Sequence, residues 1–292
     1  MAVEEHDLPR SPRRLAHVIN DITPLILTYN EAPNIARALA SVSWAKDIVI
    51  VDSFSDDDTL EIASSFSQVR IFRRQFDSHR NQWEFGLKQT EIKTPWVLAL
   101  DADYVLSDDL IAELRDLHPD AETDGFRAKF IYCINGKKLH SGIYPPATVL
   151  YRRDAASYVQ DGHTQRVALA GPVQDLRAPI FHDDRKSLKR WFNSQARYTE
   201  LEAQKLLAAD AAALGFADRL RRCRFIMPAT MLFYCLFVRG GIFDGWAGFY
   251  YAFQRSAAEL MLSLHLIENS FNGTRVHSWH QRLSRRRGSS DY

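Results

Sequence analysis

Two aspartates behind an apolar run are the residues of this chain whose types and spacing point most directly to chemistry. Residues 96–100 are all apolar, and Asp101 and Asp103 follow them. Such a run is typical of a parallel strand that is covered on both faces. In open α/β sheets, ligands bind at the carboxyl ends of the strands, where this pair would stand. Two carboxylates there can hold a divalent cation against a phosphate; the alternative is that they only cap the next helix.

Two earlier strand ends carry polar residues as well. Thr28 and Glu31 follow a predicted strand at 22–27, and Asp52 ends another at 47–52. Each has a plain structural interpretation, because the first pair can cap a helix and Asp52 can form an Asx-type turn with the loop behind it. These separate interpretations do not explain why three strand ends in one half of the chain deliver polar side chains to the same edge. We therefore expect these side chains to share one site.

The elements that must position these residues alternate along the N-terminal part of the chain. Strands are expected at 22–27, 47–52, 69–72 and 96–100, and helices at 33–42, 59–66 and 78–89. This order of strand and helix predicts a parallel sheet with right-handed crossovers, so the fold class is α/β.

The pattern changes after the two aspartates. Ser107 can cap a helix that reaches 116, and Asn135-Gly136 is a strong type I′ signal for a hairpin. The hairpin strands are expected at 126–134 and 137–143, a further strand at 148–152, and short apolar pieces at 158–182.

The C-terminal third is helical and partly apolar. A helix is expected at 186–210, and residues 225–238 are an almost wholly apolar run that follows four arginines. Apolar residues continue to 267 after a break at Gly240 and Gly241. The run is too short to span a bilayer, which takes about twenty residues. Residues 219–267 are therefore either a buried helix pair or a membrane-surface segment with a basic collar.

These patterns divide the chain into four parts. They are a flexible leader at 1–20, a catalytic domain at 21–185, a helical extension at 186–269 and a basic tail without fixed structure at 270–292.

Charge and cysteine usage exclude some classes. Lys and Arg number 37 against 36 for Asp and Glu, which argues against a general nucleic-acid binder. The 3 cysteines are far apart, so they give neither a disulfide framework nor a zinc spacing, and they favour a reducing compartment. The leader has no apolar core of a secretory signal, so we expect a cytoplasmic protein.

The strand-end motifs together resemble those of family 2 glycosyltransferases of the GT-A fold. The likeness rests on residues 27–31, on Asp52 with its loop, and on residues 100–103, and it covers about 22–268. Residues 239–248 look like a segment of the branch that includes lipopolysaccharide core glucosyltransferases.

The resemblance implies a role for each motif. Residues that would contact the nucleotide part of a sugar donor are Thr28, Tyr29, Glu31, Asp52, Arg80, Asn81 and Asp101. Asp52 would bind the base, uracil by preference, and Asp101 would contact the ribose side or a metal-bound water. Asp103 would bind Mg²⁺ or Mn²⁺ on the diphosphate, whose developing charge a divalent cation neutralises.

The resemblance also locates a general base for the acceptor hydroxyl. Many relatives carry a His-Glu pair where this chain has His163 and Thr164, and threonine is no general base at neutral pH. Asp161 is therefore the first candidate and His163 the second, unless Asp161 lies in a surface turn or His163 is a metal ligand. His182 can reach the metal or serve as a structural histidine.

The function expected on this basis is inverting transfer of a hexose from a nucleotide-sugar, UDP-linked by preference. The acceptor would be a cell-envelope glycan or a lipid-linked molecule at the cytoplasmic face of the inner membrane. A sugar nucleotidyltransferase is a rival, although residues 28–33 contain neither the glycine nor the lysine of a triphosphate-binding loop. A non-catalytic, membrane-associated nucleotide-binding or scaffold protein is another, supported by Thr164.

Overall fold

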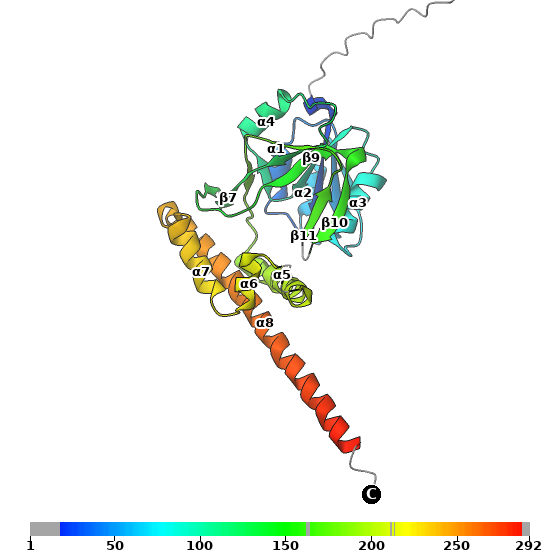
Figure 1. Cartoon of the computed structure of the whole chain (residues 1–292). Coiled ribbons are helices and arrows are strands. Elements are labelled where there is room, and N and C mark those ends of the chain that lie inside the picture. Colours follow the sequence, from blue (N-terminus) through cyan, green and yellow to red (C-terminus); the bar gives the residue numbers. More distant parts are fainter. Residues whose placement is uncertain (1–17, 162–163, 211, 213, 288–292) are drawn as a thin grey trace, which may run out of the picture.

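The molecule is built on a central sheet of seven strands, in the order β12-β6-β9-β4-β1-β2-β3 (Figure 1). This computed structural model describes residues 18–161, 164–210, 212 and 214–287. The strands are β1 (Ile22–Thr28), β2 (Ile48–Asp52), β3 (Val69–Arg73), β4 (Trp96–Asp101), β6 (Gly125–Ala128), β9 (Ala147–Arg152) and β12 (Val173–Asp175). Only β9 runs antiparallel to its neighbours in this sheet.

The first four strands confirm the predicted parallel arrangement. They are joined by α1 (Ile35–Ser41), α2 (Thr59–Ser64) and α3 (His79–Gln89). Successive residues of the strands point to opposite faces, so Leu25 and Ile26 belong to different hydrophobic clusters. Because both faces are covered, β2 and β4 are apolar along their whole length until the aspartate at the carboxyl end of each.

The expected hairpin is only partly confirmed. Asn135 and Gly136 both have positive φ, 50° and 83°, as a type I′ turn requires, but the strand after them, β8, is only Lys137–Lys138. The single strand expected at 126–134 is in fact two, β6 and β7 (Phe130–Ile134). The division arises because β6 pairs with β9 and β12 in the central sheet, whereas β7 pairs with β13 and β8.

A second, smaller sheet therefore lies beside the end of β4. Its order is β5-β13-β7-β8, with β5 at Tyr104–Leu106 and β13 at Ile180–His182. Ser107 caps α4 (Asp108–Arg115), as expected, and η1 (Val18–Asp21) and η2 (Arg153–Ala155) are short helical turns. The remaining strands, β10 (Ser157–Asp161) and β11 (Thr164–Ala168), pair with each other antiparallel. The second sheet brings His182 next to Tyr104, three residues beyond the end of β4.

Helices form the rest of the molecule. They are α5 (Leu188–Ala208), α6 (Phe216–Arg222), α7 (Met227–Phe233), η3 (Tyr234–Val238), η4 (Gly241–Asp244) and α8 (Trp246–Arg287). Figure 1 shows α8 passing the other helices and extending away from the sheet. We expected an irregular tail from 270, but α8 continues to Arg287, because adding a residue to an existing helix needs no new nucleation.

The segment at 219–267 forms a packed helix pair with an exposed apolar side, and its contact with a membrane surface stays a prediction. α7 and α8 pack together through a buried cluster that includes Met227, Met231 and Tyr251. Large apolar side chains on the outer surface of the same helices, Phe233 and Phe253 among them, are exposed. Within the part of the chain that the structure describes, no helix is both long and apolar enough to cross a bilayer.

Candidate active site

Three strand ends meet at one edge of the central sheet, as the sequence predicts. The register of β1 and β2 places Thr28 beside Asp52, and the register of β1 and β4 places Leu27 beside Asp101. The loops that leave these strands bind each other through hydrogen bonds such as Asn30 N to Ser55 Oγ at 2.7 Å. The parallel topology thus assembles one polar surface from residues far apart in the chain.

The buried side chain of Asp52 joins the ends of β1 and β2 through hydrogen bonds. Its side chain is fully buried, and its carboxylate accepts hydrogen bonds from Thr28 Oγ1 at 3.0 Å and from Ser55 N at 2.9 Å. Ser55 Oγ donates a further bond to the same carboxylate. These contacts are those of the Asx-type turn that was the alternative to a ligand role. A direct bond from Asp52 to a nucleotide base stays a prediction.

Two aromatic side chains stand open on the same edge. Tyr29 follows β1 and Phe54 follows β2, with exposures of 54% and 45%. The guanidinium of Arg73 lies 4.6 Å from the ring centre of Phe54, and that of Arg190 lies 5.8 Å from the ring centre of Tyr29. Exposed rings flanked by arginines offer a stacking surface beside positive charge.

Asp103 and His182 form a contact that couples the two sheets. Nε2 of His182 lies 3.3 Å from Oδ2 of Asp103, and both side chains are 13% exposed. The histidine ring packs against the rings of Tyr132 and Tyr144, each with its ring centre 4.7 Å away. Of the two uses considered for His182, reaching the metal position or packing alone, this contact favours the first.

Burial and charge give the two aspartates opposite properties. Burial, together with the negative charge of Asp103, raises the pKa of Asp101 to about 6. Burial also disfavours the charged form of Asp103, but the charge and hydrogen bond of His182 outweigh it and lower the pKa of Asp103 to about 2. Burial lowers the pKa of His182, but the charge and hydrogen bond of Asp103 outweigh burial and raise it. Of this pair, Asp103 is therefore the carboxylate that stays ionised to the lower pH.

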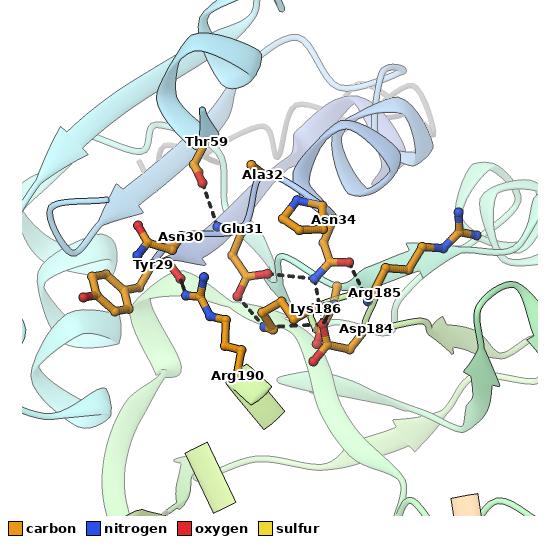
Figure 2. A network of polar contacts seen from close by, with 12 residues as sticks. Tyr29, Asn30, Glu31, Ala32, Asn34, Thr59, Asp184, Arg185, Lys186 and Arg190 are labelled. Carbon is orange, nitrogen blue, oxygen red and sulfur yellow. Dashed lines mark hydrogen bonds and ion pairs between the residues drawn. The ribbon is translucent and has the colours of Figure 1, made fainter. Parts of the chain in front are cut away.

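A lysine and a glutamate close the edge from the other side (Figure 2). Nζ of Lys186 lies 2.7 Å from Oε1 of Glu31 and 3.6 Å from Oδ1 of Asp184. Asn34 donates to both Glu31 and Asp184, at 2.9 Å each. Burial raises the pKa of Glu31 to about 7, although Lys186 acts in the opposite direction. The result is a polar cluster in which one ammonium group is held between the carboxylates of Glu31 and Asp184.

The donor set at this edge fits a hard divalent cation. Oδ1 of Asp103 and Nδ1 of His182 are buried and have no hydrogen-bond partner among the described residues. Carboxylate oxygen and imidazole nitrogen are both suitable ligands for Mn²⁺, and carboxylates suit Mg²⁺. No group of three or more His, Cys, Asp or Glu side chains converges within the described part of the chain. Asp103 would therefore supply the carboxylate ligand through Oδ1, with His182 beside it on the other oxygen, and a phosphate ligand would have to complete the coordination.

Arg80 and Asn81 lie at a different place from the acids. They line a shallow cavity of about 340 Å³ together with Arg74, Glu84, Phe85, Lys88 and Gln89. Asn81 donates to Asp77 at 3.0 Å, and Asp77 is also bound by Arg74. None of the strand-end acids lines this cavity. Contact of Arg80 and Asn81 with a nucleotide stays a prediction.

The candidate bases cannot be placed. Asp161 ends β10 and its backbone pairs with Thr164, but the side chains of both lie outside the described residues, as does the whole of His163. Their roles stay predictions.

Lys186 and Asn34 are site residues that the sequence analysis missed. Lys186 comes shortly after the very short strand β13 and directly before Ser187, which caps α5. A strand of three residues shows no periodicity, so nothing marked its end as a part of the sheet edge. The available signal was composition, because residues 182–186 are all titratable.

Comparison with known proteins agrees with this geometry. The model of the family described as glycosyl transferase family 2 matches residues 25–161. A protein of Rickettsia bellii named as an uncharacterized glycosyltransferase is 31% identical over 201 residues, covering 64% of this chain and 67% of the relative. A similarly named protein of Rickettsia prowazekii is 25% identical over 201 residues, and the aligned region covers 64% of this chain and 68% of the relative.

One solved structure shows the same architecture. It is the mannosyltransferase PcManGT from Pyrobaculum calidifontis in complex with GDP-Man and Mn²⁺, with a TM-score of 0.52, 14% identity, and coverage of 88% of this chain and 91% of that chain. The present chain belongs to glycosyl transferase family 2. It is a glycosyltransferase with a GT-A-like α/β fold, which favours sugar transfer over nucleotidyl transfer.

Proposed function

We propose that this glycosyltransferase moves a hexose from a UDP-sugar to a hydroxyl of a cell-envelope glycan or a lipid-linked acceptor. The reaction depends on Mg²⁺ or Mn²⁺ and inverts the anomeric carbon. The observation that carries the proposal is the Asp103–His182 pair, which has two buried polar atoms without partners at the carboxyl end of β4. Ligands of open α/β sheets bind at this edge.

The acids around Lys186 favour a divalent cation at this edge. Glu31, Asp103 and Asp184 surround the single ammonium of Lys186, and a diphosphate entering alone would be repelled. A divalent cation held by Asp103, beside His182, would neutralise the charge that develops on the leaving diphosphate. Lys186 then adds a second positive charge from the side of α5.

Inversion requires one displacement and one base. The acceptor oxygen attacks the anomeric carbon, the bond from that carbon to the diphosphate oxygen breaks, and the bonding electrons leave with the diphosphate. The acceptor proton passes to a base, for which Asp161 is the first candidate and His163 the second. No enzyme nucleophile takes part.

The nucleotide would lie across the open aromatic residues. Tyr29 and Phe54 offer faces for the base and ribose, and Glu31 and Asp101 would contact the nucleotide, as the family resemblance implies. Asp52 shapes the loop beneath them through its buried hydrogen bonds. Preference for uracil follows from the family resemblance of the Asp52 motif, and is tested by comparing donors.

The acceptor side faces the C-terminal helices. Residues 239–248, the segment that resembles lipopolysaccharide core glucosyltransferases, connect η3 to α8 and contact the second sheet. We place the reaction at the cytoplasmic face of the inner membrane, where residues 219–267 meet the membrane surface. Exposed apolar side chains such as Phe225 and Phe253 support this placement.

Donor binding tests the proposal first. Thermal unfolding is measured with UDP-, GDP- and dTDP-sugars, with and without Mn²⁺, because a bound ligand stabilises the native state by mass action. We expect a UDP-sugar to raise the melting temperature most, and only with metal. A larger shift with a GDP-sugar would reject uracil recognition.

Turnover of the Asp103→Ala variant tests the metal role. We expect loss of metal-dependent transfer with the fold intact, whereas the matched variant Asp175→Ala, which changes an exposed carboxylate on β12, should stay active. Full activity of Asp103→Ala in EDTA would reject the role of Asp103 as a metal ligand.

A further inference from the structure

The turn between η3 and α8 is an exposed apolar tip. Within residues 237–246, five large side chains are exposed: Phe237 58%, Val238 62%, Ile242 43%, Phe243 91% and Trp246 59%. The one other exposed large side chain of this turn is Arg239. We call these residues the hairpin tip, because α7 and η3 lead to it and α8 leads away (Figure 1).

The hairpin tip has a fixed conformation. Gly240 and Gly245 take left-handed φ values of 74° and 62°, which side chains disfavour. A Cβ on Gly248 would overlap the carbonyl oxygen of Gly241, so the chain passes itself too closely for any other residue. The buried carboxylate of Asp244 accepts hydrogen bonds from Ser141 N at 3.0 Å and from His140 N at 3.2 Å. The apolar side chains are thus held outward by a rigid turn that is fastened to the sheet domain.

Positive charges surround the hairpin tip. Nζ of Lys137 lies 6.0 Å from the ring centre of Trp246, and Arg239 donates to the carbonyl of Gly142 at 2.9 Å. Lys137 and Arg239 are exposed, and none of the ion pairs between described residues involves them, whereas Nζ of Lys138 lies over the ring of Phe181 at 3.9 Å. The acid of the tip, Asp244, is buried and already bonded.

We propose that the hairpin tip inserts into the interfacial region of a bilayer that carries anionic lipids. Phenylalanine and tryptophan with a collar of lysine and arginine match that region, where apolar rings enter the acyl boundary and cations meet the headgroups. A second copy of this chain is a poorer occupant. A two-fold contact over the tip would bring Lys137 and Arg239 of both copies together.

The inserted tip would lie close to the transfer site. Tyr251 of α8 packs on Tyr132 with ring centres 4.8 Å apart, and Tyr132 packs on His182 at 4.7 Å. His182 contacts Asp103 at 3.3 Å. These successive contacts link the tip to the transfer site. If the tip is inserted, a lipid-linked acceptor would present its headgroup beside the donor, a step that rests on the proposed function. Membrane binding itself does not depend on that function.

Vesicle sedimentation tests the proposal on the full chain. Wild type should sediment with phosphatidylcholine vesicles that contain phosphatidylglycerol and much less with phosphatidylcholine alone. The double variant Phe243→Ser with Trp246→Ser should bind at least about tenfold more weakly, because two large apolar side chains no longer enter the bilayer. Lys137→Glu should reduce the preference for the anionic lipid.

Phe216→Ser is the matched control. Phe216 is 84% exposed, but its helix α6 contacts α8 at Glu259, about 20 Å along α8 from Trp246. It should bind vesicles like wild type. An equal loss with Phe216→Ser, no sedimentation of wild type, or a wild-type dimer in light scattering that the tip variant abolishes would each overturn the proposal.

UDP-induced stabilisation separates this inference from the proposed function. The tip variant should keep the wild-type thermal shift with UDP and Mn²⁺. If no nucleotide stabilises either protein but vesicles still bind the wild type through the tip, the proposed function fails and the membrane inference stands.

Discussion

Lys186 places its ammonium nitrogen 2.7 Å from Oε1 of Glu31, although the two residues are 155 positions apart in the chain. The contact joins the segment before α5 to the loop after β1, and both side chains are nearly buried, at 17% and 13% exposure. Burial alone would lower the pKa of Lys186, but the charges of Asp103 and Glu31 raise it. The ammonium of Lys186 therefore stays charged, and it interacts electrostatically with Asp103, the carboxylate that we assign to the divalent cation.

Lys186→Met should weaken UDP binding more than uridine binding. A charge-assisted hydrogen bond contributes about 1.5–3 kcal/mol, so loss of the ammonium should raise the Kd of UDP by about tenfold or more. The Kd of uridine, which has no phosphate, should change little. Calorimetric titration of both ligands in Mn²⁺ measures the ratio.

Lys186→Arg is the control for this prediction, because it keeps the charge. It should retain most of the UDP affinity that the methionine variant loses. If Lys186→Met lowers the melting temperature but leaves the ratio of UDP to uridine affinity unchanged, Lys186 only holds Glu31 and Asp184 in place.

His182→Ala should raise the Mn²⁺ concentration that UDP needs for its stabilising effect. The imidazole contacts Asp103 and has a buried, unpartnered nitrogen, and loss of groups around a metal costs about 10–100-fold in affinity. A Mn²⁺ titration of the melting temperature at fixed UDP gives the half-maximal concentration. His140→Ala changes a histidine that is 93% exposed and should leave the titration unchanged. Coincident curves for wild type and His182→Ala would remove His182 from the metal site.

Asp52→Ala should destabilise the protein more than it harms the chemistry. The substitution leaves Thr28 Oγ1 and Ser55 N without their buried acceptor, and each such loss costs about 1–3 kcal/mol. Urea unfolding should show a loss of about 2–5 kcal/mol. Under conditions where the variant is folded, uridine affinity decides between the two interpretations of Asp52. A large loss of uridine affinity in the folded variant would restore the base-binding role.

The sequence was sufficient to predict the half of the site that comes from regular strands. Asp52 and Asp101 end apolar runs long enough to be assigned, and the alternation of strand and helix predicted that their ends meet at one edge. Only the register of β1, β2 and β4 had to be supplied by the structure. Physical chemistry constrains this half strongly, because a buried parallel strand can hardly have another composition.

The other half comes from segments without a periodic signal. His182 ends a strand of three residues, and Lys186 lies in the loop after it. Whether Phe126 and Phe130 share a strand was decided by competition between two sheets, which depends on contacts distant in the chain. Local patterns carry no information about such pairings.

Gly248→Ala should destabilise the hairpin tip without affecting donor binding. The added Cβ meets the backbone oxygen of Gly241, which cannot move as a side chain would, and overpacking of this kind costs about 1–3 kcal/mol. Vesicle binding should fall with stability, whereas the thermal shift caused by UDP should persist. Gly215→Ala is the matched control, because a Cβ there meets nothing within 4 Å, and urea unfolding should show little change. An equal loss of stability in the two variants would contradict the close approach seen at Gly248.

Asp244 should make the attachment of the hairpin tip sensitive to acid. Burial disfavours its charged form, but the hydrogen bonds from Ser141 and His140 lower the pKa of Asp244 to about 2, below its ordinary value of 3.8. Because the folded pKa is the lower one, the unfolded chain binds the proton first as the pH falls. The stabilisation is therefore complete above about pH 5 and is lost between about pH 4 and pH 2.

Comparison of wild type with Asp244→Asn isolates this contribution. The asparagine side chain cannot ionise, so its own stability should not follow this titration, and at pH 7 the variant should be less stable because an amide accepts fewer hydrogen bonds than a carboxylate. A pKa difference of this size corresponds to about 2 kcal/mol, and the gap between the two unfolding free energies should shrink by that amount from pH 5 to pH 2. Urea unfolding across this range measures the gap. A gap that stays constant with pH would show that Asp244 does not hold the tip as an ionised carboxylate.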